Sequence, residues 1–580
     1  MITPASQGGL FDPALRIGAI SSITAASARV NLHRAGVPGG TLHKGARYGL
    51  GEVGEFVLVE SELAAILARI IEVRLPESER SVVDNPAGGG VTVDAVAQIQ
   101  LLGTIALDGL AVTAGISVHP RLGDRVFSAP AVLLAAVPLL MERNSGSSPA
   151  VSLSIGRVSA STGAEVHVTP ERLFSRHCAI LGATGGGKSY TVSRFIEECI
   201  RYKSKVVLID ATGEYRGFSE HTSHVHLGRP SDELAASKKC SLPPSSFTEA
   251  DFNALFQPAG KTQGPKLRAA IRSLRLVAAR PALEQPEKPG VLVRANRRKQ
   301  EILRVEQEEA ISRLLNNPTT PFDAFRLADQ IVEECVYETP FARGNPDGSQ
   351  WGGYNEGDLS YCTTLLTRIN GVLTSPALEC VFGKDQGPSI ADQISSFLTS
   401  DKRLLRISLE GIQYEFAARE IVANALGRFL LGKARAGDFR KLPVLLMVDE
   451  AHNFLGRKIG DEDAHLKLDS FEGIAKEGRK YGLNLCLATQ RPRDITYEVL
   501  SQMGTLIVHR LTNDQDREVV ERACGEIDKS ASAFLPNLEP GEAAIVGVDF
   551  PIPLTIQVTA PSTPPKSNGA NFQKHWSAGQ

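Results

Sequence analysis

Three short stretches of the sequence carry residue types that act together on a nucleotide. Residues 182–189 fit the pattern G-x-x-x-x-G-K-[ST], in which closely spaced glycines let backbone N–H groups converge on phosphate oxygens. We expect Lys188 to contact the β- and γ-phosphates of ATP and Ser189 to bind Mg²⁺. The predicted ATP site comprises Gly182, Ala183, Thr184, Gly185, Gly186, Gly187, Lys188, Ser189 and Tyr190.

The second and third stretches are apolar runs that end in polar side chains. "VLLMVDE" ends in Asp449, expected to orient magnesium-bound water, and Glu450, expected to be the general base. The alternative, an acidic N-cap of the next helix, loses weight because the glycine loop is also present. "LNLCLATQ" ends in Gln490, whose amide would sense the γ-phosphate and hold the attacking water. A polar group in a strand-end turn is the alternative for Gln490.

The surrounding elements alternate between strands and helices. "HCAILGA", the glycine loop, "SYTVSRFIEECIRYK" and "KVVLID" give the strand, loop, helix and strand order that a phosphate-binding loop requires. We therefore predict an α/β fold with a RecA-like core in two parts, 151–235 and 401–560, interrupted by a helical insertion at 236–400. Residues 1–150 are typical of a small β-barrel, and 561–580 of a flexible Pro/Ser/Gly-rich tail.

Three arginines of the predicted insertion, Arg268, Arg272 and Arg275, fall on one face of a helix. Solvated surface charge is the favoured interpretation of this spacing, and contact with phosphates is the alternative.

Composition bounds the class of protein. The chain has 580 residues, 42% of them hydrophobic, and a net charge of −2, which is typical of a globular protein of several domains. No apolar run is long enough for a transmembrane helix, and the N-terminus has no signal-peptide pattern, so we expect a cytoplasmic protein without a membrane partner. The eight scattered cysteines favour buried, reduced thiols over zinc ligands or disulfides.

Five stretches together resemble the HerA branch of the HerA/FtsK ATPases: "LFSRHCAILGATGGGKSYT", "VLIDATGEY", "LLMVDEAHNFL", "IAKEGRKYGLNLCLATQRP" and "LEPGEAAIVG". The β-rich N-terminus, with "YGLGEVGEFVLVES", resembles the HAS barrel of that family. "DATGEY" departs from the more usual D-P-x-G-E-Y, although its acidic and glycine positions remain. The resemblance implies a homo-hexameric ring that hydrolyses ATP between subunits and threads double-stranded DNA through its channel.

The resemblance also implies roles for further charged residues. Arg176 matches the arginine ahead of the phosphate loop, which acts at the nucleotide site. Arg479 matches the arginine expected to reach a neighbouring subunit's γ-phosphate, with Lys480 and Arg510 as weaker alternatives. A surface ion pair is the alternative for Arg176 and Arg479. Asp210 matches an acidic position near the nucleotide, and Glu214 is a weaker candidate for that role.

Three functions compete for such a chain. The first is a DNA translocase that works with a separately encoded nuclease of the NurA type, and the second is an anti-phage scaffold that joins a nuclease or sirtuin-like NADase effector. The third, a conjugation coupling ATPase of the TrwB type, ranks last because those proteins usually carry membrane helices. The sequence does not separate the first two.

Overall fold

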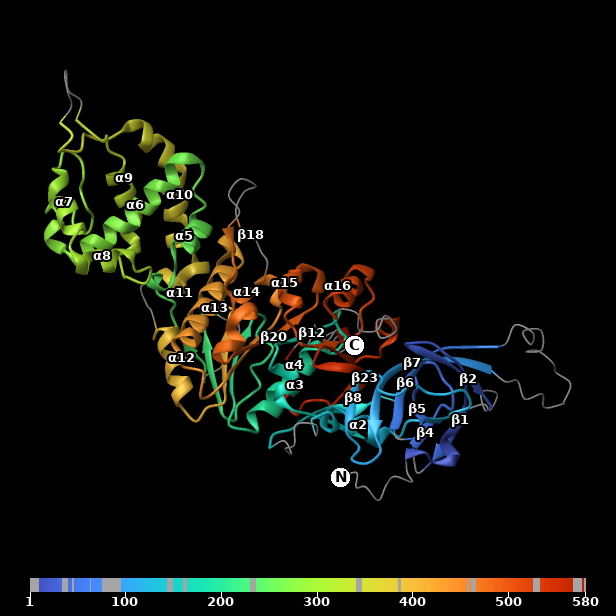
Figure 1. Cartoon of the computed structure of the whole chain (residues 1–580). Helices are drawn as coiled ribbons and strands as arrows, with labels where there is room; N and C mark the ends of the chain where they lie inside the picture. The colour runs from blue at the N-terminus through green and yellow to red at the C-terminus, as the bar shows by residue number, and fades with distance from the viewer. Residues whose placement is uncertain are drawn as a thin grey trace. The chain divides into compact units, whose positions relative to one another are not determined.

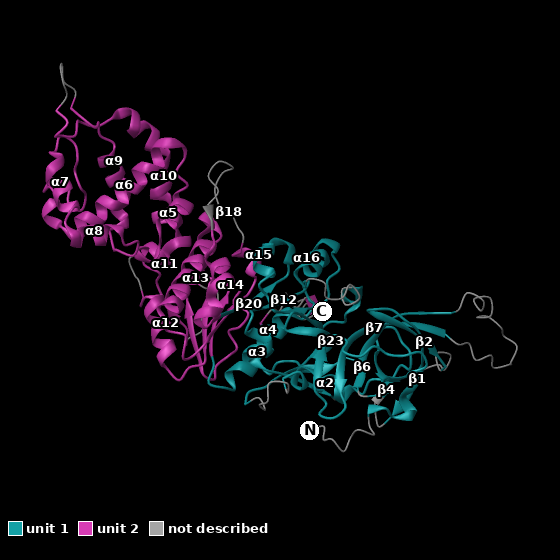
Figure 2. Ribbon diagram, in the orientation of Figure 1, with its two compact units in different colours: residues 1–204, 484–565 teal, residues 205–483, 566–580 magenta. Residues whose placement is uncertain are grey.

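The computed structural model describes residues 10–33, 40–43, 46–62, 64–75, 95–142, 150–159, 164–229, 236–340, 347–383, 387–455, 458–459, 466–524, 533–566 and 576–577 (Figure 1). These residues fall into two compact units (Figure 2). The first unit contains residues 1–204 and 484–565, and the second contains 205–483 and 566–580.

The first unit begins with a closed β-barrel, which confirms the predicted N-terminal fold. Its strands are β1 (Arg16–Ile23), β2 (Ser27–Leu32), β5 (Phe56–Glu60), β6 (Ala64–Arg74), β7 (Ala95–Ala106), β8 (Val112–Ala114) and β9 (Arg125–Ser128). They follow the order β2-β1-β9-β5-β6-β7-β8, and pairing of β2 with β7 closes the ring. Ala28, Val30 and Leu32 alternate with more exposed residues along β2, so one face of the strand fills the barrel core. A hairpin, β3 (Thr41–His43) and β4 (Ala46–Tyr48), and helix α2 (Ala131–Leu140) accompany the barrel.

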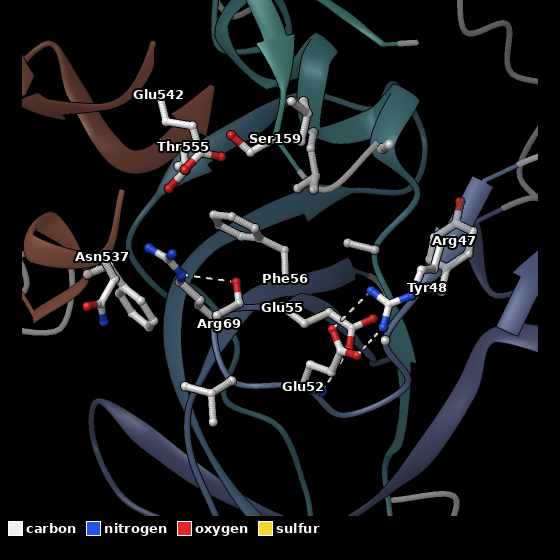
Figure 3. A pocket seen from close by; sticks show the side chains of 18 of the residues that line it. Arg47, Tyr48, Glu52, Glu55, Phe56, Arg69, Ser159, Asn537, Glu542 and Thr555 are labelled. Atoms are coloured by element: carbon white, nitrogen blue, oxygen red, sulfur yellow. Dashed lines mark hydrogen bonds and ion pairs between the residues drawn. The ribbon is translucent and has the colours of Figure 1, made fainter. Parts of the chain in front are cut away.

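A cavity of about 360 Å³ lies where the barrel meets later strands of the same unit (Figure 3). The guanidinium group of Arg69 contacts two rings in the cavity wall, with its central carbon 5.2 Å from the centre of the Phe56 ring and 4.0 Å from that of the Phe534 ring. Its Nε also donates a hydrogen bond to the carbonyl oxygen of Gly54 at 3.2 Å. Arg69 thus ties barrel strand β6 to a segment more than 450 residues later in the chain.

The other strands of the first unit form a mixed sheet in the order β11-β10-β23-β22-β21-β12-β20. They are β10 (Leu153–Val158), β11 (Glu165–Val168), β12 (Cys178–Leu181), β20 (Leu483–Thr489), β21 (Thr505–Val508), β22 (Glu542–Gly547) and β23 (Phe550–Val558). Its helices are α3 (Pro170–Phe174), α4 (Lys188–Ile200), α15 (Tyr497–Leu500) and α16 (Asp514–Cys524). Strand β12 lies between β20 and β21 and is parallel to both, so all three carboxyl ends meet at one edge.

The second unit carries a parallel sheet in the order β17-β13-β16-β14-β15. These strands are β13 (Lys205–Asp210), β14 (Thr222–His226), β15 (Lys238–Lys239), β16 (Leu404–Ser408) and β17 (Val444–Val448). Helices α13 (Ala418–Ala436) and α14 (Ser470–Glu477) pack on each other, and a short hairpin joins β18 (Lys458–Ile459) to β19 (Leu466–Lys467). The central strands are buried on both faces, as continuous apolar runs predict.

Helices occupy the segment between β15 and β16, where the insertion is predicted. They are α5 (Glu249–Phe256), α6 (Gly260–Ala279), α7 (Lys299–Glu306), α8 (Glu309–Asn316), α9 (Leu327–Glu334), α10 (Glu356–Thr374), α11 (Glu379–Phe382) and α12 (Ile390–Thr399). Arg268 and Arg272 pair with Glu249 and Glu306, whereas Arg275 is buried and donates to the carbonyl oxygen of Pro318. Solvated charge is therefore the wrong interpretation for Arg275, because this side chain is a packing element.

Two other sequence features have definite places in the structure. All eight cysteines are buried with free thiols. The predicted flexible tail starts with fixed residues, since the N–H of Thr563 donates to Glu197 at 2.6 Å and that of Lys566 to the carbonyl oxygen of Glu214 at 2.8 Å. Residues 567–575 and 578–580 of the tail lie outside the described residues. No helix in the described ranges is long and apolar enough to span a membrane.

Candidate nucleotide-binding site

The glycine loop connects the carboxyl end of β12 to the first residue of α4. Gly185 and Gly187 have φ angles of 78° and 113°, a region that residues with a Cβ rarely adopt. Gly187 is the N-cap of α4, and the helix begins at Lys188, whose side chain is buried. The loop therefore has the backbone turn, the helix N-terminus and the lysine that a phosphate cradle needs.

Backbone hydrogen bonds from neighbouring segments hold this loop in place. The N–H of Gly541 donates to the carbonyl oxygen of Gly186 at 3.1 Å, and the N–H of Ala183 donates to that of Arg510 at 3.2 Å. A Cβ on Gly182 would lie 2.6 Å from the Cβ of His509, a distance that real Cβ atoms essentially never show. The glycine at 182 is required by packing as well as by the phosphate pattern.

Gln490 lies beside the loop, at the carboxyl end of β20. Thr184 Oγ1 donates a hydrogen bond to Gln490 Oε1 at 2.5 Å. The parallel register of Leu181 with Thr489 explains this proximity, because both chains leave the sheet at the same edge. The structure thus brings two of the three predicted stretches together within the first unit, and the role of Gln490 as a γ-phosphate sensor stays a prediction.

The acidic pair belongs to the second unit, directly after β17. Asp449 and Glu450 are both buried, and the N–H of Asp449 donates to the carbonyl oxygen of Ile209 at 3.1 Å. Glu450 has a φ angle of 47°, in the left-handed region, and its Oε2 lies 3.3 Å from Nδ1 of His452. A left-handed residue that is not glycine costs on the order of 1–3 kcal/mol, a strain that clusters at functional sites.

Asp210, predicted to lie near the nucleotide, has its carboxylate engaged by protein groups. Its Oδ2 lies 2.6 Å from Nε of Arg406, and it accepts hydrogen bonds from the N–H groups of Gly213 and Tyr215. The side chain is fully buried. In this arrangement Asp210 orders the loop that contains Glu214, and a direct contact with nucleotide stays a prediction.

Arg176 lies at the end of β12 that is opposite to the glycine loop. The four residues of β12 alone span ~13 Å, at about 3.3 Å per residue. The carbonyl oxygen of Arg176 accepts a hydrogen bond from the N–H of Gly504 at 2.7 Å. The side chain of Arg176 is half-exposed, and its Nε lies 3.4 Å from Oδ1 of Asp549. This position directs Arg176 away from the phosphate loop of its own chain.

Arg479 has an equivalent position before β20. It lies in the short helix Gly478–Tyr481 and is exposed, as is Lys480. The seven residues of β20 separate this helix from Gln490. Arg510 differs, because it lies at the carboxyl end of β21, where its Nε donates to the carbonyl oxygen of Pro536 at 3.1 Å.

His509 is a buried residue of this site that the sequence analysis does not single out. Its Nε2 lies 2.8 Å from Thr191 Oγ1, and its Nδ1 lies 2.7 Å from the carbonyl oxygen of Glu542. Burial, with a smaller contribution from the nearby Lys188 charge, lowers the pKa of His509 to about 4. Its sequence context, an apolar strand ending in a polar residue, gives no signal that distinguishes it from an ordinary core histidine.

Comparison with known proteins shows a similarity to HerA helicases. The model of the helicase HerA central domain matches residues 153–348, which include the glycine loop. The DNA double-strand break repair helicase HerA of Pyrococcus furiosus is 26% identical over 488 residues, or 81% of this chain and 78% of that protein. Its counterpart in Sulfolobus acidocaldarius is 24% identical over 414 residues, or 70% of this chain and 68% of that protein. The chain is thus similar to HerA helicases, and its residues 153–348 match the central domain of that family.

The glycine loop and the match to the helicase HerA central domain make the chain a P-loop ATPase. Solved structures align at lower similarity. VirB4 of Thermoanaerobacter pseudethanolicus is 14% identical with a TM-score of 0.44, covering 73% of this chain and 98% of that chain. The plasmid coupling protein TrwB in complex with ADP and Mg²⁺ is 16% identical with a TM-score of 0.41, covering 69% and 89%.

Proposed function

We propose that this HerA-like protein is a homo-hexameric, ATP-driven translocase on double-stranded DNA that serves a separately encoded effector. The glycine loop, with Gln490 hydrogen-bonded to its Thr184, is the observation that carries the ATPase part of this proposal. The DNA part is supported by the relatives, which are DNA double-strand break repair helicases. A net charge of −2 is compatible with DNA binding if basic groups are confined to a channel.

The residues present fit Mg²⁺ and ATP. Residues 182–190 would hold the phosphates by their backbone N–H groups, with Lys188 neutralising their charge. Ser189 and Asp449 would hold the magnesium ion, which supplies charge neutralisation when it is bound. Glu450 would accept a proton from the attacking water, and Gln490 would orient that water.

Arg176 and Arg479 would act on the nucleotide of a neighbouring subunit. Each precedes a strand whose carboxyl end faces the site, so neither is placed to reach phosphates at that end in its own chain. In a closed ring the opposite edge of one subunit can face the nucleotide of the next. An arginine supplied in trans would neutralise developing charge and make hydrolysis depend on subunit contact.

The second candidate function is an ATPase scaffold that assembles and gates an effector, such as a nuclease or a sirtuin-like NADase. The closed barrel favours it, because a module repeated around a ring gives a multivalent docking surface. The two candidates differ in whether duplex DNA drives ATP turnover.

The deciding experiment measures ATP hydrolysis by the full chain, with and without duplex DNA, at increasing salt. A translocase gives turnover that rises with duplex DNA, and the rise shrinks with salt because phosphate contacts release counterions. Glu450→Gln is the control for contaminating ATPases. Turnover indifferent to duplex DNA at low salt, with and without an effector encoded beside it, would favour the scaffold.

A further inference from the structure

His509 connects the helix that follows the phosphate loop to the strand β22. It lies directly after β21 and is fully buried. On one side its ring reaches Thr191 in the first turn of α4, and on the other it reaches the carbonyl oxygen of Glu542. A Cβ added to Gly182 would lie 2.6 Å from the Cβ of His509, and one added to Gly187 would lie 3.2 Å from its Cε1. His509 therefore packs against both ends of the glycine loop.

The hydrogen-bond partners fix the tautomer of the ring. A carbonyl oxygen can only accept, so Nδ1, 2.7 Å from the carbonyl oxygen of Glu542, carries the proton. In the neutral ring, Nε2 is then an acceptor, and the Thr191 hydroxyl must donate to it. The carbonyl oxygen of Gly187 is a weaker partner for that hydroxyl, at 3.3 Å against 2.8 Å for His509.

We propose that neutral His509 is a positioning residue of the ATP site, which holds Thr191 and thereby sets the start of α4 against the phosphate loop. The inference rests on the proposed ATPase function of the same loop. Thr191 lies three residues after Lys188, and its N–H donates to the carbonyl oxygen of Gly187 at 3.0 Å. A displaced Thr191 would therefore displace the backbone N–H groups and the lysine that bind phosphate.

The electrostatic environment keeps this arrangement intact near neutral pH. Burial is the main cause that lowers the pKa of His509, and the charge of Lys188 acts in the same direction. The carbonyl oxygens of Glu542 and Gly186 act in the opposite direction. The ring stays neutral, so Nε2 remains available as the acceptor for Thr191.

Two substitutions at position 509 separate the two hydrogen bonds. His509→Gln places an amide near the position of Nε2 and can still accept from Thr191, whereas His509→Asn reaches only the position of Nδ1. Thr191→Val removes the hydroxyl at nearly constant shape, and Thr191→Ser retains it as the matched control. We expect His509→Asn and Thr191→Val to raise the KM for ATP about tenfold, because each removes the hydrogen bond between Thr191 and Nε2 of His509.

The readout is the split between KM and kcat for ATP in the full-length protein, with binding of MgADP measured separately. A positioning role raises KM and weakens MgADP binding while kcat at saturating ATP changes less, and His509→Gln and Thr191→Ser stay within about threefold of wild type. The double variant His509→Asn with Thr191→Val has a KM for ATP no higher than that of the more affected single variant, because the two substitutions remove the same contact. If His509→Asn fails to fold, Thr191→Val tests the same contact.

Unchanged KM and MgADP binding in Thr191→Val, while the wild type hydrolyses ATP, would overturn the inference and leave the proposed function intact. Equal loss in His509→Gln and His509→Asn would also overturn it, because packing and not the Thr191 contact would then matter. A wild type that neither binds nor hydrolyses ATP overturns both the inference and the proposed function.

Discussion

Mixing two inactive variants tests whether Arg176 acts across a subunit boundary. Arg176→Ala removes the arginine, and Glu450→Gln removes the general base, so each alone should form rings with little turnover. The position of Arg176 at the amino end of β12, ~13 Å of strand away from the loop, places it outside the nucleotide site of its own chain. A neighbour would therefore have to supply the arginine.

The expected rescue follows from counting interfaces. In a ring assembled at random from equal amounts of the two variants, a site is complete when its own subunit has an intact Glu450 and its neighbour an intact Arg176. Each condition holds with a chance of one half, so about a quarter of the sites are complete. With independent sites, turnover should recover to about 25% of wild type, whereas an arginine acting in cis gives no complete site.

The assay is phosphate release at saturating ATP, with mixed rings verified by native mass measurement of differently tagged subunits. The control mixes Lys188→Ala with Glu450→Gln, which remove two groups expected to serve the same nucleotide, so this pair should show no rescue. Turnover below a few per cent of wild type in verified mixed rings of Arg176→Ala and Glu450→Gln would refute the trans role. A protein that stays monomeric with every nucleotide would refute the ring itself.

Four other predictions follow from individual residues. Arg479→Ala mixed with Glu450→Gln should recover turnover as Arg176→Ala does, and an unrescued mixture would leave Arg479 as a surface residue. The pKa of His509 lies at about 4 in the folded chain against an ordinary 6.5. At pH values between these two, His509 binds more protons in the unfolded chain than in the folded chain. The resulting stability is complete above pH 6.5 and declines as the pH falls towards 4, a loss of about 2 kcal/mol by pH 5.0. The melting temperature of wild type should therefore fall more steeply than that of His509→Gln between pH 7 and 5, and parallel curves would contradict the assignment. Glu450→Gly should abolish turnover yet stabilise the fold by about 1 kcal/mol, because glycine adopts the left-handed conformation without strain; a lower melting temperature would contradict this. Arg69→Met should destabilise the first unit by about 2 kcal/mol through loss of the stack with Phe56 and Phe534, and Arg69→Lys should restore little, which thermal unfolding would show.

The sequence by itself determined the elements and the phosphate chemistry. Glycine and lysine spacing between an apolar strand and a helix is a local pattern, because the loop, the N-cap at Gly187 and the start of α4 involve consecutive residues. Apolar runs that end in Asp449 and Gln490 likewise predict buried parallel strands, whose carboxyl ends carry polar groups. These features need no knowledge of distant contacts.

Tertiary structure decided which residues support that chemistry and from which side. His509 and Gly541 are more than 300 residues from the glycine loop, and their contacts with it depend on the positions of β21 and β22 in the sheet. Arg275 shares a helical face with Arg268 and Arg272, yet burial against Phe322 separates its role from theirs. Arg176 is close to the loop in sequence and distant from it in space, because an extended strand carries the chain from one edge of the sheet to the other. Local spacing fixes what a segment can form, whereas burial and strand direction fix what each side chain can reach.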